Sequence, residues 1–423
     1  VLGYAALSTD DVGNFSTAIG HGALNAQNYA TSTDGYNTAV GAKAGESITT
    51  GVHNTLIGGA TGDALTDADY NVSLGYATLT ADTLGSKSVA LGSFTLANQN
   101  FTTATDTFNI AIGYASGLSV TTGVSNTLIG GLAGDALTDA DENVAVGTFA
   151  LGVDTLGSKS TAIGRGALAN QNFTTATDVY NVAVGFNAGA AITTGSSNTL
   201  IGGQAGDSMT TGSYNTAVGM NAIGDGTVTG SLNTAVGMKA GFSVTSGSNN
   251  LLLGNEAGLT GSPGGSIGTS SNKIVLSDEN ITEANIQVDW TVASDQRDKT
   301  DFTALDLGLD FVKALAPVTY KWDKRSKYGD KYADDYDLND QTPDGTHKED
   351  WLDIGFKAQE VQALEEAAGY TTAAKKNLTV STSGDGKQMG LQYSKFVPIL
   401  VKAVQEQNAL IEALTARIAT LEG

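Results

Sequence analysis

The first two thirds of the chain repeat a five-residue pattern of polar, apolar and glycine positions, for which Asn-Thr-Ala-Val-Gly is typical. The first position is Asn or Ser, the third is usually Ala, the fourth is always aliphatic, and the last is Gly. A short apolar run bounded by Asn and Gly predicts a short β-strand in every copy. The copies begin at Ser16, Asn37, Asn54, Asn71, Ser88, Asn109, Asn126, Asn143, Ser160, Asn181, Asn198, Asn215, Asn233 and Asn250.

The spacing of these copies divides the region into coils. Most copies lie 17 residues apart, and the step after each Ser copy is 21 residues. The pattern as a whole returns after 72 residues, and the linkers return with it, since the sequence of residues 97–101 recurs at 169–173. A duplicated block of four coils explains this periodicity. One strand per coil cannot bury its own aliphatic row, so the coils must stack on one another.

Stacking also assigns a role to the polar and glycine positions. Equivalent Asn side chains would form a hydrogen-bonded ladder along the stack, and the closing Gly would take a corner that other residues avoid. Proline would interrupt the ladder, and the first proline of the chain is Pro263. We therefore predict a mainly β fold for residues 1–278, a parallel β-roll or β-helix of stacked coils of about 17 residues.

This repeat resembles the head repeats of trimeric autotransporter adhesins, whose units read Asn-x-Ala-Ile-Gly. The stretch Asn272-Lys273-Ile274-Val275-Leu276-Ser277-Asp278 is also similar to the end of such a head. The resemblance implies a left-handed parallel β-roll with three chains side by side, and hence a homotrimer. The coils here are longer than the usual adhesin coil, so a β-helix cross-section stays open beside the flat roll.

Charge and composition exclude several classes of protein. The formal net charge is −22, whereas binding to nucleic acid needs a basic surface. No run of about 18 apolar residues occurs, so we expect no membrane insertion. The absence of cysteine excludes disulfides and thiolate metal sites. The chain opens inside a repeat, at Val1-Leu2-Gly3, so we expect it to be a piece of a longer protein.

Two features of the loops need a chemical interpretation. Acidic clusters such as Asp63, Asp67 and Asp69 lack the spacing and glycine of an EF-hand, so a solvated loop is favoured over calcium, and we predict no metal and no cofactor. Aromatic residues among Asn and Gln suit either stacking on sugars or covering the flank of the roll, and both interpretations stay open. These aromatic residues are Tyr29, Phe101 and Phe173.

After residue 299 the pattern becomes that of an α+β segment. Residues 304–316 carry apolar side chains at helical spacing, and Pro317 ends the helix that this spacing predicts. Residues 318–322 alternate as a strand, and residues 354–361 indicate a strand that leads into a helix.

A heptad pattern of apolar residues runs from Val397 to Leu421, with Gln407 as its one polar core position. Sustained spacing of this kind predicts a coiled coil. The predicted domains are the repeat fibre (1–278), a connector (279–294), an α+β core (295–392) and a coiled-coil helix (393–423).

Four motifs follow one another in this C-terminal part. They are Ser294-Asp295-x-Arg297-x-Lys299, Leu315-x-Pro317-x-x-Tyr320-x-Trp322, Gly355-Phe356-x-Ala358-Gln359-Glu360-Val361, and Tyr393-Ser394-x-Phe396-Val397-Pro398-x-Leu400 with Ala403-Val404-Gln405-Glu406. From about residue 290 onward, the chain resembles the intramolecular chaperone domain at the C-terminus of phage endosialidases and many phage tail fibres. The resemblance implies that this domain trimerises, aligns three fibre chains and cuts itself off through a Ser–Lys dyad, whose positions Ser294 and Lys299 match.

The chemistry of a Ser–Lys dyad suits these two residue types. A serine hydroxyl is a weak nucleophile until a base removes its proton, and a lysine becomes such a base when burial lowers its pKa. The spacing of Ser294 and Lys299 alone would fit a surface serine beside an ion-paired lysine, and the three other motifs favour the dyad. The bond beside Ser294 that would be cut stays open.

We therefore predict a homotrimeric phage tail fibre that carries its own folding chaperone and a single-turnover protease activity. Its expected partners are a host cell-surface receptor, a polysaccharide by preference, and other virion tail proteins that it joins through a preceding part. The first alternative is a bacterial trimeric surface adhesin, which would need a C-terminal membrane anchor where this chain has a heptad helix. The second is a polysaccharide-degrading tailspike, which would need a carboxylate pair in a groove, whereas the acidic residues of the repeat lie mostly in loops.

Overall fold

The chain is described from a computed structural model, which covers all residues except 225, 288–289, 334 and 372–375. The described residues divide into two compact units. The first consists of Val1–Leu259 with Gly268–Ser277, and the second of Thr260–Ile267 with Asp278–Gly423. Each unit is treated by itself.

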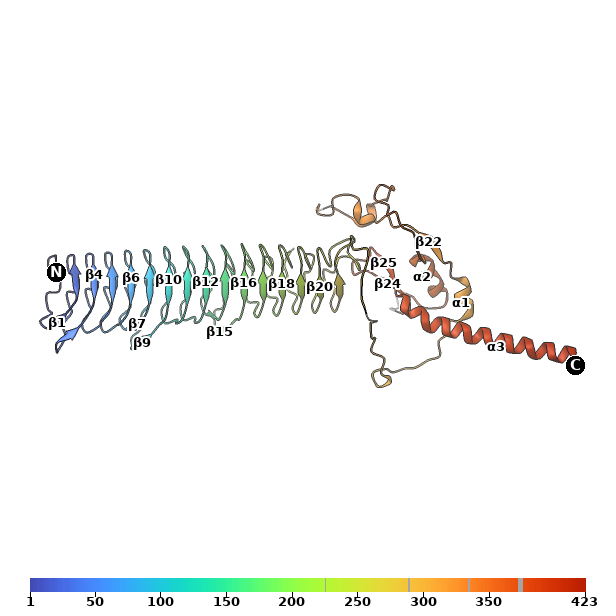
Figure 1. Cartoon of the computed structure of the whole chain (residues 1–423), viewed down its shortest axis with the longest axis horizontal. Coiled ribbons are helices and arrows are strands. Elements are labelled where there is room, and N and C mark those ends of the chain that lie inside the picture. Colours follow the sequence, from blue (N-terminus) through green and yellow to red (C-terminus); the bar gives the residue numbers. More distant parts are fainter. Residues whose placement is uncertain (225, 288–289, 334, 372–375) are drawn as a thin grey trace. The chain divides into compact units, whose positions relative to one another are not determined.

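The first unit is a solenoid whose coils stack along one axis, and its main parallel sheet has fifteen strands within the described residues (Figure 1). Neighbouring strands pair in register, so that Ala39 lies beside Leu56 of the next coil. The predicted mainly β fold of stacked coils with parallel strands is confirmed. The strands are β2 (Thr17–Ile19), β4 (Thr38–Val40), β5 (Thr55–Ile57), β6 (Val72–Leu74), β8 (Val89–Leu91), β10 (Ile110–Ile112), β11 (Thr127–Ile129), β12 (Val144–Val146), β14 (Thr161–Ile163), β16 (Val182–Val184), β17 (Thr199–Ile201), β18 (Thr216–Val218), β19 (Thr234–Val236), β20 (Leu251–Leu253) and β21 (Ile274–Leu276).

Additional short strands lie outside this sheet, one just before each Ser copy and its partner within the 21-residue step that follows, and each pair recurs with the 72-residue block. These strands pair in parallel across the longer loops. The pairs are β1 (Gly13–Asn14) with β3 (Thr33–Asp34), β7 (Gly85–Ser86) with β9 (Thr105–Asp106), and β13 (Gly157–Ser158) with β15 (Thr177–Asp178).

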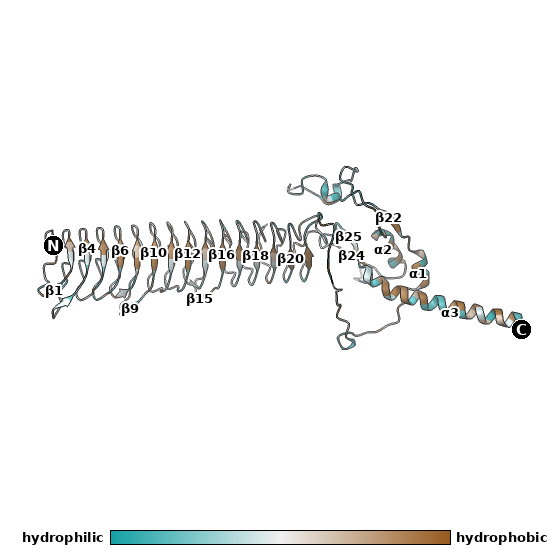
Figure 2. Ribbon diagram, in the orientation of Figure 1, coloured by the Kyte–Doolittle hydropathy of each residue, from teal (hydrophilic) through white to brown (hydrophobic). Residues whose placement is uncertain are grey.

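The side chains of each strand alternate between the solenoid interior and the outside. The third position of the pattern faces inward, and Ala39 and Leu56 have no exposed surface. The fourth position faces outward, so that Ile57 is 37% exposed and Leu74 is 48% exposed. Our expectation that stacking buries the aliphatic row is therefore wrong for the single chain, because successive side chains point to opposite faces of a strand. The outward fourth position is aliphatic along the stack, so the outer face of the sheet is apolar. Figure 2 shows hydrophobic strands in brown along the solenoid.

The predicted Asn ladder is confirmed and lies inside the solenoid. The backbone N–H of Asn54 donates to Oδ1 of Asn37 at 2.8 Å, and that of Asn71 donates to Oδ1 of Asn54 at 3.0 Å. Nδ2 of Asn54 donates to the carbonyl oxygen of Ala68 at 2.7 Å. A coil that shifted out of register would lose these hydrogen bonds and leave buried polar groups unpaired. Each such group costs roughly 1–3 kcal/mol, so the ladder stabilises the observed register.

The closing glycine takes the predicted corner. Gly41 has a φ of +144°, and a Cβ atom at this position would lie 2.1 Å from the carbonyl oxygen of Gly58. Both the dihedral angle and the close approach of the next coil therefore require glycine here.

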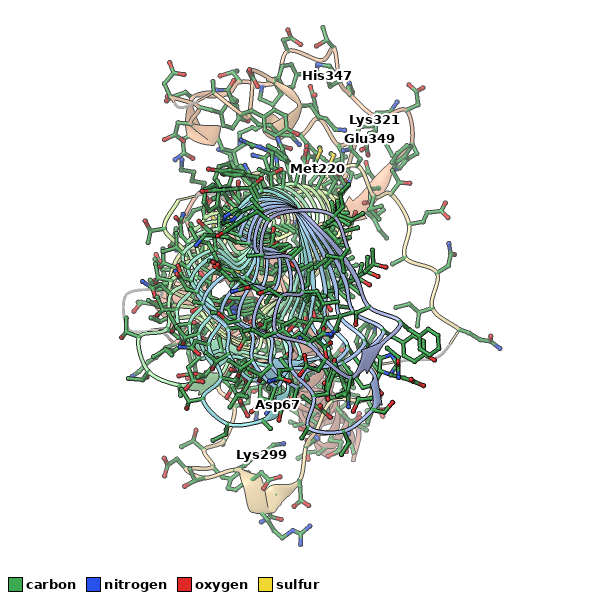
Figure 3. The ribbon with its side chains drawn as sticks, turned by 90° about the vertical axis from the view of Figure 1, so that its left-hand side faces the viewer. Asp67, Met220, Lys299, Lys321, His347 and Glu349 are labelled. Carbon is green, nitrogen blue, oxygen red and sulfur yellow. The ribbon has the colours of Figure 1, made fainter. Side chains whose placement is uncertain are left out.

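Four of the loop residues singled out in the sequence, two acidic and two aromatic, make contacts within the solenoid or are buried in it. Asp67 accepts a hydrogen bond from the Thr50 hydroxyl at 2.6 Å, and Asp69 accepts one from the Val52 N–H at 2.7 Å. Asp67 lies at the edge of the coil stack in Figure 3. Tyr29 and Phe101 are only 5% and 6% exposed, so they cover the flank of the solenoid, and stacking on sugars is excluded for these two rings.

Asp63 and Asp135 occupy equivalent places in successive blocks but differ in their partners. The Thr80 hydroxyl donates to Oδ1 of Asp63 at 2.5 Å, whereas the residue equivalent to Thr80 in the next block is Gly152. Oδ1 of Asp135 is buried and has no hydrogen-bond partner among the described residues. Burial raises the pKa of the Asp135 carboxyl. The duplication has therefore left one acceptor without its donor.

We expect Gly152→Thr to stabilise the solenoid by about 1–2 kcal/mol at neutral pH, because the new hydroxyl supplies the missing donor and the unfolded chain loses entropy. A Cβ atom at residue 152 would lie 3.6 Å from Oδ1 of Asp135. A raised pKa means that the wild type loses stability as pH rises through that pKa, so the gain should shrink in acid, where Asp135 is protonated. Thermal unfolding at both pH values measures this.

The matched control is Gly131→Thr, since a Cβ atom at residue 131 would have no neighbour within 4 Å. This variant reports the entropic effect of losing a glycine without a new hydrogen bond. An equal gain for both variants, or a gain at Gly152 that does not depend on pH, would contradict the assignment of Asp135 as an unpaired acceptor.

The second unit is the predicted α+β segment. Its strands form two antiparallel pairs, and its helices pack around an apolar core of Leu307, Phe311, Val361, Phe396 and Ile399. The elements are η1 (Gln296–Asp298), α1 (Leu309–Ala314), β22 (Val318–Tyr320), η2 (Arg325–Lys327), η3 (Leu338–Asp340), β23 (Asp353–Gly355), α2 (Ala358–Ala367), β24 (Val380–Thr382), β25 (Met389–Leu391), η4 (Tyr393–Lys395) and α3 (Phe396–Glu422).

Helix α3 carries the heptad and is a single helix of 27 residues. Phe396, Ile399 and Ala403 on one face are buried in the unit, whereas Ile411 and Leu414 are 53% and 59% exposed. The heptad positions therefore face outward from the single chain. Within the described residues, no helix combines the length and the apolar character that a membrane span needs.

Candidate functional site

A short turn brings the two residues of the predicted dyad together. Five residues of extended chain would span about 17 Å, but η1 folds residues 296–298 back on themselves. Asp295 caps this turn, since its carboxylate accepts the Arg297 backbone N–H at 2.9 Å. The Lys299 N–H closes the turn by donating to the carbonyl oxygen of Gln296 at 3.2 Å.

Ser294 and Lys299 are in direct contact. Nζ of Lys299 donates to Oγ of Ser294 at 2.6 Å and to the backbone carbonyl oxygen of Ser294 at 3.3 Å. Figure 3 shows Lys299 on the segment that carries the turn. This geometry puts an amine within proton-transfer distance of the hydroxyl and beside the carbonyl of the same residue.

Asp295 and Arg297 hold the turn and were not assigned a role from the sequence, although both belong to the first motif. Nη2 of Arg297 donates to Oδ2 of Asp295 at 2.6 Å, and Nε donates to Oδ1 at 3.1 Å. The guanidinium lowers the pKa of the Asp295 carboxyl. An aspartate followed two residues later by an arginine, just before a dyad lysine, is the signal that could have identified this pair.

The dyad is exposed to solvent in the single chain. Residues 294 to 299 are all exposed, and so are Trp290 and Val292 before them, at 72% and 78%. A lysine that acts as a general base needs to be desolvated. The contact is therefore in place, while the burial that would activate it requires something that covers this segment.

The second to fourth motifs meet in one cluster of the second unit. The hydroxyl of Tyr393 accepts the Phe356 backbone N–H at 3.2 Å, and a Cβ atom at Gly355 would lie 2.3 Å from that hydroxyl. The rings of Phe356 and Phe396 stack with centroids 5.5 Å apart. Trp322 donates from its indole to Asp353 at 3.2 Å. The motif residues thus build the domain rather than a second site.

Glu406 of the last motif explains where α1 begins. Its carboxylate accepts the Leu309 backbone N–H at 2.7 Å, and this hydrogen bond lowers the pKa of Glu406. A Cβ atom at Gly308 would lie 2.2 Å from the same carboxylate. The sequence pattern predicts a helix over residues 304–316, but the observed helix α1 covers only Leu309–Ala314. It begins at Leu309 because the contact with Glu406 on α3 fixes its first turn.

Comparison with known proteins identifies one family. Residues 294–370 match the family described as the chaperone of endosialidase, and the match begins at Ser294. No curated protein and no solved structure matches the chain. Residues 294–370 of the second unit are thus similar to the chaperone of endosialidase, and the β-solenoid of the first unit lies outside this similarity.

Proposed function

We propose that the protein is a homotrimeric phage tail fibre whose C-terminal chaperone domain aligns three solenoids and then cuts itself off beside Ser294. The observation that carries this proposal is the contact between Nζ of Lys299 and Oγ of Ser294 at 2.6 Å. This contact lies at the start of the segment that matches the endosialidase chaperone. In the proposed reaction Lys299 takes the proton of the Ser294 hydroxyl, and the oxygen forms an ester bond with the carbonyl carbon of the adjacent peptide bond. The C–N bond of that peptide breaks, and its nitrogen leaves as an amine with the proton that Lys299 returns. Water then hydrolyses the ester, which frees the serine hydroxyl and leaves a carboxylate on the other side of the cut.

The outer face of the main sheet supports the trimer. Every strand from β2 to β20 presents an aliphatic residue outward at the fourth position of the pattern. With a strand spacing of about 4.8 Å, this makes an apolar surface on the order of 70 Å long. Monomeric soluble proteins rarely expose an apolar patch of that extent, so three such faces packed together are the natural way to cover it.

Light scattering tests the proposed interface. We expect the wild type to have about three times the mass of the 43.0 kDa chain, or of its fibre fragment once the domain is cut and removed. The double variant Ile57→Glu, Ile201→Glu should abolish that trimer. Each substitution places a charge in the apolar interface, one on β5 and the other on β17. Thr102→Glu with Thr174→Glu adds equal charge on exposed loops and should leave the trimer intact. A wild-type monomer would contradict the proposal.

For the receptor we propose a polysaccharide of the host cell surface. Its support is a row of exposed rings at the corner after the closing glycine, where Tyr76 is 58% and Tyr114 62% exposed. Phe94 lies between them and is perpendicular to both rings, so neither tyrosine is stacked in parallel on Phe94, and aromatic rings with this much exposed surface suit contact with sugar rings. Incubation with host polysaccharide should show binding without shortening of the polymer. Shortening would favour the tailspike alternative, and no binding would contradict this part of the proposal.

A further inference from the structure

A group of contacts inside the second unit joins residues that precede Ser294 to residues that follow it. Thr260–Ile267 and Asp278 onward belong to this unit, so a cut beside Ser294 would leave its members on two different fragments. Glu279 and Asn280 would stay with the fibre, and the residues that hold them would leave with the domain. These contacts do not involve the exposed residues 281–287 and 290–294 that lead to the dyad.

The centre of the group is a buried ion pair between Glu279 and Lys331. Their side chains are 5% and 16% exposed, and Nζ of Lys331 lies 2.9 Å from Oε1 of Glu279. Nζ of Lys324 donates to the backbone carbonyl oxygen of Glu279 at 2.8 Å and pairs with Glu349 at 3.1 Å. Lys327 donates to Oδ1 of Asn280. Three lysines of the domain thus hold two consecutive residues of the fibre side.

A second contact lies on the loop 260–267. The backbone N–H of Ser266 donates to Oδ2 of Asp385 at 3.2 Å. Gly265 has a φ of +70°, and a Cβ atom there would lie 2.8 Å from Oδ1 of Asp385. A Cβ atom at Gly261 would lie 2.6 Å from Cβ of Ser326. Two glycines of the fibre side therefore let the domain approach their backbone closely.

The domain residues that make these contacts are also tied to one another. Nη2 of Arg325 donates to the carbonyl oxygen of Lys387 at 2.5 Å, and Nη1 donates to that of Leu338 at 3.3 Å. Nζ of Lys387 pairs with Asp337 at 3.1 Å. The loop that carries the three lysines and the β24–β25 turn that carries Asp385 thus form one surface.

We propose that this surface is a clamp that keeps the chaperone domain on the end of the fibre after the peptide bond has been cut. The proposal rests on the self-cleavage proposed above. Cleavage removes the covalent link between the fibre and the domain, but it breaks none of the contacts of Glu279, Asn280, Gly265 or Ser266. A buried pair is poorly screened by salt, and removing one partner leaves the other charge buried and unpaired. Release of the domain is therefore a second step, separate from the cut.

The test compares denaturing gels with size-exclusion chromatography of the assembled, fully cut wild type. We expect two fragments on the gel and one co-eluting complex on the column at about 0.15 M salt, where the Debye length is near 8 Å. Lys331→Met should weaken retention on the order of a hundred-fold, so that the C-terminal fragment elutes alone. Glu279→Gln should act similarly, and the double variant should lose less than the sum of both.

Lys313→Met is the matched control, because Lys313 is exposed and pairs with Asp310 on α1. It should keep the complex, and all variants should be cut to the same extent on the gel. Separation of the wild-type fragments at low salt, or equal retention in Lys331→Met and the wild type, would overturn the clamp.

A second arm tests the clamp even where self-cleavage fails. If the wild-type chain stays whole on the gel, the self-cleavage proposal is wrong, and the clamp is then tested by an external protease cut. In Ser294→Ala, a recognition sequence for a specific protease replaces the exposed residues 281–287, so that external cutting leaves Glu279 and Asn280 on the fibre. Co-elution after this cut supports the clamp, and separation overturns it.

Discussion

Ser294→Ala is expected to leave a single full-length chain after assembly, and Lys299→Ala is expected to do nearly the same. The two residues touch at 2.6 Å, and a nucleophile and its base act as a unit, so the loss of either should slow the cut by a factor on the order of a thousand or more. Lys299→Arg should fail as well, because a guanidinium keeps its proton near neutral pH. Denaturing gels of the purified proteins, before and after assembly, measure the effect.

Thr300→Ala is the control, since it removes a hydroxyl from an exposed residue next to the dyad. This variant should be cut like the wild type. The cut should also wait for assembly, because residues 294 to 299 are exposed in the single chain and only a covering partner would desolvate Lys299. A Ser294→Ala chain that is cut at the wild-type rate would show that another group performs the reaction.

Deletion of residues 295–423 is expected to turn a soluble fibre into aggregates. The coils are nearly identical, so three chains can pair out of register by one coil or by a whole 72-residue block at little cost in energy. The apolar outer face of the sheet would meanwhile stay uncovered. The proposed C-terminal trimer would remove both problems, because it would fix the register and raise the local concentration of the chains. The yield of soluble trimer on refolding from denaturant measures the effect.

The same residues should be dispensable once the fibre exists. Removing the domain after assembly, by the natural cut or at an engineered site, should leave a heat-resistant trimer, because its unfolding is then limited by a kinetic barrier. If the truncated chain instead refolds cleanly to a soluble trimer without the domain, the chaperone has no role in folding this fibre.

The repeat made the solenoid predictable because each coil repeats the same chemical requirements. Asn37 and Gly41 mark the two ends of a strand, and both perform the expected function. Whether the aliphatic fourth position faces the interior or the outside was not predictable. In a strand of three residues the side chains alternate between the two faces, but the sequence does not show which face is inside. The structure shows that the third position is the inner one, where Ala39 and the larger Leu56 are both fully buried.

The sequence predicted which two residues form the candidate site, but it did not predict how exposed they are to solvent. The motif placed Ser294 and Lys299 together, and the turn at η1 brings them into contact. Their exposure depends on what surrounds the connector in an assembly, which no local pattern describes. The contact of Glu279 with Lys331 joins residues 52 positions apart, and nothing in the spacing of either residue indicates it.

An intact-mass spectrum of the assembled wild-type protein tests the central claim most directly. The account predicts two masses whose total equals the 43.0 kDa chain plus one water molecule, with the break on one side of Ser294. The smaller mass also identifies whether the bond before or after Ser294 is cut. A single mass of 43.0 kDa from a heat-resistant trimer would contradict self-cleavage and leave Ser294 and Lys299 with structural roles only.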